Sequence, residues 1–211
     1  MTIKQLLKEI RSYPTPYQFV QKRLLSGIPW IFSADENSFV KWKTEASKAC
    51  GVGTEYIYLV GSAKTGFSMS PSKPGQGFRP ISPTERWPSD IDIAIVDKAL
   101  FEAGWNTILS YDRTKGIAKV IQNGPPIPLR ERIERMRLNI YWGTLSDAYT
   151  ISGTETAQRI RSLFSATTRL SPFQGYKPRA RIYRRREDLV SYHVQSIEQL
   201  LDTLQKKGED N

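Results

Sequence analysis

The stretch "PSDIDIAIVD" (residues 88–97) places two carboxylates, Asp90 and Asp92, at the start of a run of Ile, Ala and Val. Such a run predicts a strand buried on both faces. Successive side chains of a strand point to opposite faces, so Asp90 and Asp92 share a face, roughly 6 to 7 Å apart. Two anions this close raise each other's pKa unless a cation lies between them. The pair therefore indicates a divalent-metal site on a central strand.

A second strand is predicted upstream, in "YIYLVGSAKTG" (residues 56–66), and it ends at a Gly-Ser turn. A strand that turns into a helix in this way offers free backbone N–H groups to a phosphate chain. Gly61 lets the backbone approach the ligand, and the hydroxyl of Ser62 can donate to a terminal phosphate. Two further candidate phosphate contacts are Lys64 and Ser89.

With the strand, the Gly-Ser turn and the Asp-hydrophobic-Asp pair in this order, residues 54–100 resemble the DNA polymerase beta type nucleotidyltransferase superfamily. That superfamily includes tRNA terminal transferases, antibiotic-modifying enzymes, oligoadenylate-type synthases and small transferases of bacterial toxin and phage-defence systems. The resemblance implies that Asp90 and Asp92 are catalytic and bind Mg²⁺ or Mn²⁺. It also implies a nucleoside triphosphate (NTP) substrate, bound by Gly61, Ser62, Ser89 and Lys64.

A third carboxylate, which the superfamily carries on a later strand, has no evident counterpart in this chain. The third predicted strand, "RARIYRR" (residues 179–185), offers Arg179 and Arg181 at that place. Arginine there would repel a second metal ion but could bind phosphate directly. Four acids remain open as substitutes for the third carboxylate: Glu131, Glu134, Asp147 and Glu187.

Basic residues dominate the later part of the chain. The formal net charge is +10, and residues 156–186 contain nine basic side chains and no acidic one. A one-signed stretch attracts polyanions through counterion release, although a solvated basic face would look the same in sequence. The basic side chains are Arg159, Arg161, Arg169, Lys177, Arg179, Arg181, Arg184, Arg185 and Arg186. Those predicted to contact phosphate or nucleic acid are Arg179, Arg181, Arg184 and Arg185.

Three functions follow from these features. The first is a Mg²⁺-dependent transferase that moves a nucleoside monophosphate from an NTP to an acceptor, with RNA, and tRNA in particular, preferred over a protein or a self-made oligonucleotide. The second is a nucleotidyltransferase fold that has lost catalysis and binds nucleotide or RNA as a sensor. A purely basic nucleic-acid-binding protein is the third, and it leaves the Gly-Ser turn and the Asp pair unexplained. A small active transferase of the toxin or antiviral-defence kind would also need a protein regulator.

Cysteine and histidine are scarce, which excludes several kinds of site. Cys50 is the only cysteine and His193 the only histidine, so neither an intramolecular disulfide nor a Cys/His zinc site can form. We expect His193 to be structural, because it lies beside the apolar stripe of the closing helix. No apolar run approaches the roughly 20 residues that span a bilayer, so we expect a cytoplasmic protein without a membrane partner.

The chain is predicted to form one α/β domain over residues 1–211, built on a small mixed sheet with flanking helices. Helices are expected at 2–12, 35–49, 98–112 and 129–150, and a long closing helix near the C-terminal end. The five prolines of residues 67–89 predict an inserted loop beside the site. The predicted parts are a helical segment (1–53), a motif-bearing core (54–100), and a third strand with the closing helix (176–206).

Overall fold

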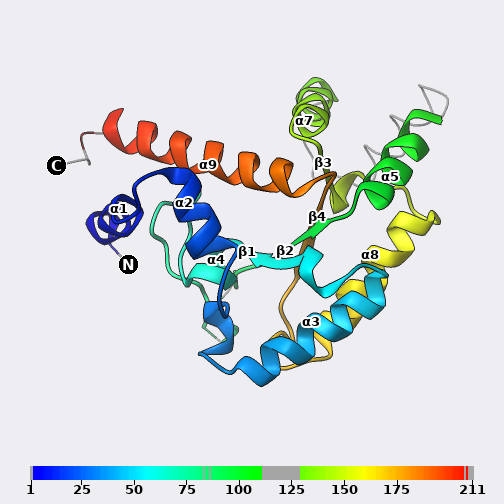
Figure 1. Cartoon of the computed structure of the whole chain (residues 1–211), viewed down its shortest axis with the longest axis horizontal. Helices are drawn as coiled ribbons and strands as arrows, with labels where there is room; N and C mark the ends of the chain where they lie inside the picture. The colour runs from blue at the N-terminus through cyan, green and yellow to red at the C-terminus, as the bar shows by residue number, and fades with distance from the viewer. Residues whose placement is uncertain (1, 83, 86, 111–128, 207, 209–211) are drawn as a thin grey trace.

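The computed structural model describes residues 2–82, 84–85, 87–110, 129–206 and 208, which form a four-stranded mixed sheet with helices on both faces (Figure 1). The sheet has the strand order β1-β2-β4-β3. The central pair, β2 and β4, is parallel, and the outer strands β1 and β3 are antiparallel to their neighbours. The predicted α/β fold with a small mixed sheet is therefore confirmed. The strands are β1 (Ile57–Val60), β2 (Ile91–Val96), β3 (Thr144–Ser146) and β4 (Pro178–Tyr183).

Helical segments surround this sheet. Among the longer helices, α3 and α8 lie together below the sheet in Figure 1, and α9 crosses above it. The α-helices are α1 (Ile3–Arg11), α2 (Pro16–Phe19), α3 (Glu36–Cys50), α4 (Gly61–Thr65), α5 (Lys98–Ser110), α7 (Leu129–Tyr141), α8 (Glu155–Thr168) and α9 (Arg186–Lys206). The short 3-10 and π segments are η1 (Val20–Leu24), η2 (Trp30–Phe32), η3 (Thr54–Tyr56) and η4 (Asp147–Tyr149).

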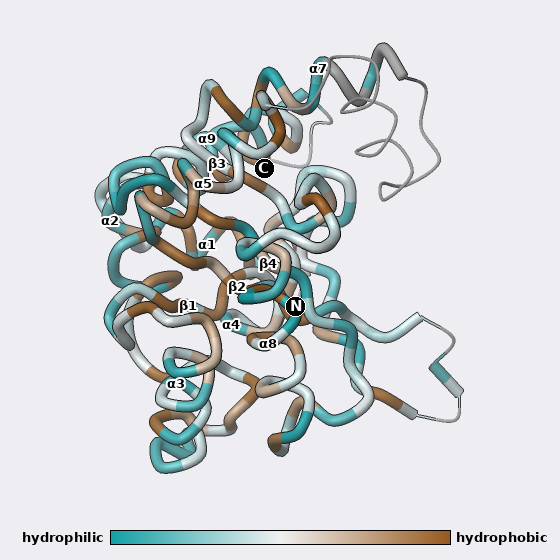
Figure 2. Tube along the Cα trace, turned by 90° about the vertical axis from the view of Figure 1, so that its right-hand side faces the viewer, coloured by the Kyte–Doolittle hydropathy of each residue, from teal (hydrophilic) through white to brown (hydrophobic). Residues whose placement is uncertain are grey.

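One face of the sheet is apolar along its length. Ile57 on β1, Ile93 and Ile95 on β2, and Ile182 on β4 are fully buried and belong to one core cluster with residues of α3, α5 and α8. Burying each such side chain contributes about 1.5–3 kcal/mol, so this face anchors the sheet. In Figure 2 the hydrophobic segments gather around the strands, and hydrophilic residues are frequent on the outer turns.

On the opposite face of the sheet, some side chains pack in a hydrophobic core and others line a cavity. Its apolar positions, among them Ala94 and Tyr183, pack in a second cluster with residues of α1, α2 and α9. Its other positions include the charged side chains of Asp92, Arg179 and Arg181 and, on β3, the hydroxyl groups of Thr144 and Ser146. In the parallel register Asp92 is paired with Arg179, and Ala94 with Arg181, so these strand neighbours share a face. The sheet thus presents its charged residues where the second cluster stops.

Local signals explain the helix ends that the sequence predicted. The side chain of Asp35 accepts a hydrogen bond from the backbone N–H of Ser38 at 3.1 Å and caps α3. Gly51, at φ +71°, ends the same helix in the left-handed conformation. The predicted helices at 2–12 and 35–49 are confirmed as α1 and α3, and the closing helix is confirmed as α9.

Two predictions about the middle of the chain were wrong or incomplete. The predicted helix 129–150 ends at Tyr141, because Gly143 takes φ +60° and the chain then enters β3 at Thr144. Helix α8 was not predicted within the basic stretch, although Thr154 caps it by accepting from the N–H of Ala157. The described residues of the loop 67–89 form neither helix nor strand apart from one isolated bridge, as predicted.

Candidate active site

Asp90 and Asp92 line one cavity. Asp92 is the second residue of β2, and Asp90 immediately precedes the strand. The cavity has a volume of about 760 Å³ and lies against β2, β4 and the residues after β3. Gly61, at the end of β1, lines it as well. Sites for small ligands and cofactors commonly measure about 300–1,000 Å³, so the space suits a nucleotide.

Gly61 lies directly beside Asp92. The antiparallel register pairs Val60 with Asp92, and Gly61 follows with φ +62°. A Cβ atom at position 61 would lie 2.5 Å from Asp92 Oδ2, closer than any real contact. Glycine is therefore required both by the backbone conformation and by the carboxylate. In sequence, 27 residues (63–89) separate Ser62 from Asp90. In the folded chain, Gly61 nevertheless lies beside Asp92.

Among the described residues, the carboxylate of Asp92 has no direct ion-pair or hydrogen-bond partner, although Lys73, Arg181 and Arg179 lie close enough to oppose the rise in its pKa. Burial raises its pKa to about 6, with the nearby charge of Asp90 as the second cause. In the described part of the chain no residue donates a hydrogen bond to Asp92 or forms an ion pair with it within 4.0 Å. A buried anion in this condition is stabilised when a cation binds. Asp90 and Asp92 therefore fit a divalent ion that completes its oxygen shell with water or phosphate.

A larger carboxylate cluster is absent from the described residues, where no group of three or more His, Cys, Asp or Glu side chains is arranged to hold a metal ion. Instead, a cation, Arg179, lies among the acids of the cavity. Its guanidinium lies 3.8 Å from Asp90 Oδ2 and 3.6 Å from Asp147 Oδ2, between the two acids. Among the four open substitutes for the third carboxylate, Asp147 lies in the cavity, where Arg179 opposes the rise in pKa that burial causes.

The other three substitutes lie elsewhere. Glu131 and Glu134 pair with Arg135 and Arg137 on the surface of α7. Glu187 lines a different cavity, which runs along α9. Asp147 was hard to single out from sequence, because β3 and η4 lie within a segment with a helical pattern. The signal that could have found it is Gly143 in "YWGTLSD", which stops the helix before β3.

Arg181 is the second cation of the cavity, and it is held rigidly. Its guanidinium donates to Asn139 Oδ1 at 3.0 Å and to Thr144 Oγ1 at 3.4 Å, and it lies 4.6 Å from the centroid of the Tyr192 ring. His193 also lines the cavity, so it is less remote than its expected structural role implied. Burial lowers the pKa of His193 to about 3, and its Nε2 atom has no hydrogen-bond partner in the described residues.

Three residues of the predicted nucleotide site do not line the cavity. Ser62 follows Gly61 in α4 and, unlike Gly61, does not line the cavity. Ser89 makes a hydrogen bond within the loop 67–89, since its hydroxyl accepts from the N–H of Arg79 at 3.0 Å. Lys64 is buried and its ammonium group donates to the carbonyl groups of Ser26 and Gly27, the latter at 2.7 Å. Burial lowers the pKa of Lys64 to about 8, and its place among these carbonyls makes it a structural residue rather than a phosphate contact.

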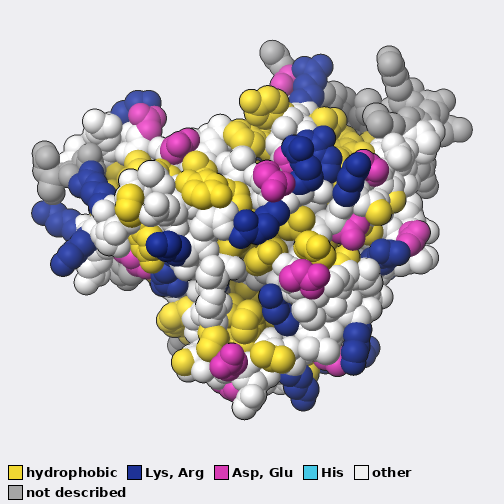
Figure 3. Space-filling view, viewed as in Figure 1, with side chains coloured by type: hydrophobic (Ala, Val, Ile, Leu, Met, Phe, Trp, Pro, Cys, Tyr) yellow, Lys and Arg dark blue, Asp and Glu magenta, His cyan; other side chains and the backbone are white. Residues whose placement is uncertain are grey.

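The predicted basic patch is divided among several elements. Arg184 and Arg185 both pair with Asp188 in the first turn of α9, and Arg159 pairs with Glu155 on α8. On the face of the molecule shown in Figure 3, Lys and Arg side chains are interspersed with Asp and Glu. The basic residues of 156–186 therefore lie on several elements, and some of them pair with acids. Of the four predicted phosphate contacts, Arg179 and Arg181 lie in the cavity and Arg184 and Arg185 do not.

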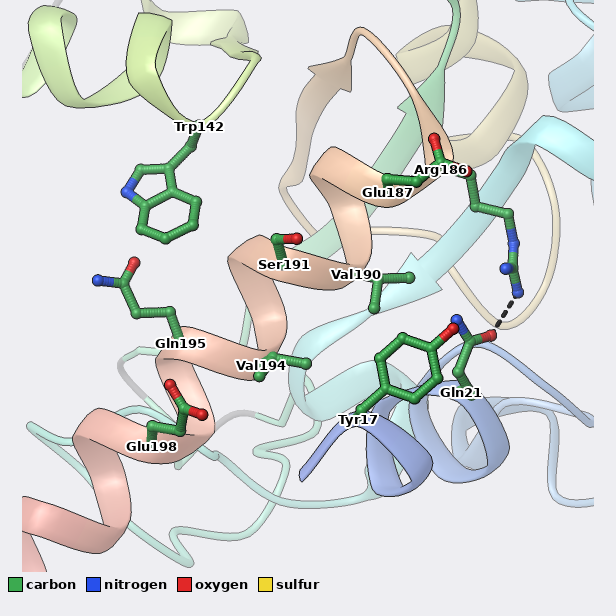
Figure 4. A pocket seen from close by; sticks show the side chains of 10 residues that line it. All are labelled: Tyr17, Gln21, Trp142, Arg186, Glu187, Val190, Ser191, Val194, Gln195 and Glu198. Carbon is green, nitrogen blue, oxygen red and sulfur yellow. Dashed lines mark hydrogen bonds between the residues drawn. The ribbon is translucent and has the colours of Figure 1, made fainter. Parts of the chain in front are cut away.

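A separate cavity of about 530 Å³ lies along α9, on the side that faces α2 and the end of α7 (Figure 4). Val190 and Val194 form its floor, and the rings of Tyr17 and Trp142 stand at its two sides. Arg186 donates to the side chain of Gln21 at its edge. Of the residues predicted or left open for the nucleotide and metal sites, Glu187 alone is among its described lining residues.

Within the described residues no helix is long and apolar enough to cross a membrane. Comparison of the chain with protein-family models, with curated proteins and with solved structures finds no match in any of the three. The resemblance of residues 54–100 to the polymerase beta type superfamily thus stays a prediction, and what bears on function is the geometry of the cavity.

Proposed function

We propose that the protein is a Mg²⁺-dependent nucleotidyltransferase that moves a nucleoside monophosphate from an NTP to an acceptor, preferably RNA. One observation carries the proposal: Gly61, from the Gly-Ser turn, lines the same cavity as Asp90 and Asp92, and the carboxylate of Asp92 lies against it. A plain strand-to-helix turn would not need a carboxylate there. Arg179, Arg181 and Lys177 line the same cavity, so cations that can bind a triphosphate lie in the same cavity as the acids.

Each side chain then has a role in the transfer. Asp90 and Asp92 would hold a divalent ion, which would neutralise charge on the phosphates and lower the pKa of the acceptor hydroxyl. Gly61 leaves room beside Asp92, and the backbone N–H groups around it face phosphate oxygens. The acceptor hydroxyl loses its proton to water and its oxygen attacks the α-phosphorus, the bond from the α-phosphorus to the oxygen that bridges it to the β-phosphorus breaks, and pyrophosphate leaves. Arg179 and Arg181 stabilise the negative charge on the leaving group.

A second candidate function is supported by the ion pairs of Arg179. Because this guanidinium contacts both Asp90 and Asp147, it occupies a place where a second metal ion would otherwise be held. A site arranged in this way could bind nucleotide or RNA without turnover, as a sensor does. The cations would then be essential and the carboxylates dispensable.

The first experiment is incubation of the purified protein with each α-³²P-labelled NTP, Mg²⁺ or Mn²⁺, and total cellular RNA. The variants are Asp90→Asn and Asp92→Asn, with Asp202→Asn as a matched control, because Asp202 is an exposed acid on α9 that pairs only with Lys206 among the described residues. Label that moves to RNA in the wild type and the control, but not in the site variants, supports the transferase.

The sensor is tested by the opposite pattern. If Asp90→Asn preserves function while Arg181→Glu abolishes it, catalysis is not the task of this site. Absence of transfer with every NTP, in a protein that still binds nucleotide or RNA, gives the same conclusion. Label that moves to protein or to a small product instead keeps the transferase and changes its acceptor.

A further inference from the structure

A third hollow lies between α7, β3 and α9, with a volume of about 410 Å³. It adjoins the cavity of the Asp pair, because Ser146, Ala148, Arg181 and Tyr192 line both. At its other end, Trp142 and Gln195 also line the cavity along α9, where the indole ring lies beside the Gln195 side chain (Figure 4). The hollow therefore extends the candidate active site away from the carboxylates.

The chemistry of this hollow differs from that of the Asp cavity. Among its described lining residues there is no Asp or Glu. It has two arginines, Arg135 and Arg181, and the aromatic rings of Trp142 and Tyr192. The other polar lining residues are three carboxamides and three hydroxyl-bearing residues: Asn139, Gln195, Gln199, Ser146, Tyr149 and Ser196. The amide of Asn139 is already bonded to Arg181 and to the carbonyl of Arg135, so Gln195 and Gln199 are the carboxamides offered to a ligand. Cations for phosphates, flat rings for stacking and amides that both donate and accept are the groups that bind unpaired nucleotides.

Part of this surface is already fixed in position. Arg181 is held by Asn139 and Thr144 and lies over the ring of Tyr192, so its guanidinium plane is set before any ligand arrives. A nucleobase can stack on a guanidinium plane as it does on an aromatic ring. Fixing these groups in advance lowers the entropy lost on binding. Bases inside a duplex have their faces covered, so only an unpaired strand can use these planes.

From this lining we infer that the hollow binds the unpaired end of a single-stranded nucleic acid and directs its terminal hydroxyl toward Asp90 and Asp92. The role of that end as acceptor rests on the proposed transferase. Binding of the strand does not, since it uses Arg135, Trp142 and the amides rather than the carboxylates.

The test is binding of fluorescently labelled oligonucleotides of about eight nucleotides, without divalent ions and at low salt, followed by anisotropy. We expect single-stranded RNA to bind at least tenfold tighter than a blunt duplex of the same sequence. Arg135→Gln should weaken single-strand binding about tenfold, through loss of a charge-assisted contact. Gln195→Ala should weaken it severalfold and serves as a second variant that leaves charge unchanged.

Arg137→Gln is the matched control. Arg137 lies two residues from Arg135 on α7, and each pairs with a glutamate on the same helix, Glu134 and Glu131 respectively, but Arg137 does not line the hollow. The control should bind within about twofold of the wild type. Equal losses for Arg135→Gln and Arg137→Gln, or equal affinity for single strand and duplex, would overturn the inference, because only the general positive field would then attract the strand.

Failure of the inference and failure of the proposed function give different results. Transfer of label by a protein that does not prefer single strands overturns the inference and leaves the transferase intact. Selective single-strand binding that Arg135→Gln removes, in a protein that transfers no label, supports the hollow as a binding site and overturns the transferase. Asp92→Asn should bind the single strand as the wild type does, and a tenfold loss in that variant would contradict the separation of the two sites.

Discussion

The guanidinium of Arg179 lies 3.6 Å from the carboxylate of Asp147, and the same group reaches Asp90 at 3.8 Å. Arg179 is also the strand neighbour of Asp92. The guanidinium of Arg179 thus lies between Asp90 and Asp147, two acids that could otherwise bind a metal ion. Because the side chain of Arg179 is 42 % exposed, it can leave these partners when phosphate enters the cavity.

We predict that Arg179→Gln has opposite effects on the two ligands. Affinity for Mn²⁺ should rise about fivefold, since a positive charge near the metal site is removed and Asp90 is freed. Affinity for NTP without metal should fall about tenfold, through loss of a charge-assisted contact to phosphate. Separate calorimetric titrations with MnCl₂ and with NTP measure both.

Arg184→Gln is the control for that experiment. Its side chain is exposed to a similar extent, 39 %, and it pairs with Asp188 outside the cavity. Both affinities should stay within about twofold of the wild type in this variant. If Arg179→Gln weakens Mn²⁺ binding, Arg179 does not compete with the metal and the proposed arrangement is wrong.

Asp92→Asn should make the fold more stable while removing metal binding. Burial and the charge of Asp90 raise the pKa of Asp92 to about 6, so at neutral pH the folded protein carries a destabilising buried anion. Neutralising it should raise the free energy of unfolding by about 1–2 kcal/mol, as urea denaturation would show. Mn²⁺ should raise the melting temperature of the wild type and not that of the variant. A less stable variant would mean that Asp92 makes a structural contact.

Three of the four strands were predictable from sequence because they have local signals, whereas β3 was not. The aliphatic run marked β2, the Gly-Ser turn marked the end of the outer strand β1, and the alternation of residues 179–185 marked β4. The pairs of Arg184 and Arg185 with Asp188 are also local in sequence, since the two arginines directly precede α9 and Asp188 lies in its first turn, four and three residues away.

Long-range contacts could not be predicted in the same way. Lys64 donates to the carbonyl of Gly27, which lies 37 positions earlier in the sequence, and no local sequence pattern predicts that contact. The position of Asp147 depends on a three-residue strand that pairs with β4, so its contact with Arg179 appears only after the chain has folded. Charge runs in sequence likewise do not say which element will carry each cation, and the basic stretch was divided for that reason.

Gly61→Ala should be more damaging than the same change at a glycine of similar backbone conformation. Gly61 has φ +62° and lies against Asp92, whereas Gly27 has φ +69° and a Cβ atom added there would meet nothing within 4 Å. The left-handed backbone costs alanine about 1–2 kcal/mol at either site. The contact with Asp92 should add about 1–3 kcal/mol at position 61 alone. Equal losses of unfolding free energy for Gly61→Ala and Gly27→Ala would show that Asp92 moves away freely.

His193→Phe should change how stability depends on pH. In the folded protein burial lowers the pKa of His193 to about 3, with the neighbouring charge of Arg181 as the second cause. The folded state therefore binds fewer protons than the unfolded state below the ordinary histidine pKa of about 6.5. The wild type keeps the full stabilisation above that pH and loses it as the pH falls toward 3.

Between about pH 8 and pH 5 the wild type should lose about 2 kcal/mol of unfolding free energy relative to His193→Phe. Urea denaturation of both proteins at each pH measures this difference. Titration of Asp92 occurs in both proteins and cancels in the comparison. Phenylalanine retains the ring that packs with Tyr183 and Tyr192 and removes the Nε2 atom that has no partner in the described residues. Parallel stability curves would mean that His193 accepts a proton in the folded protein, and that the wall of the cavity is open to water at this residue.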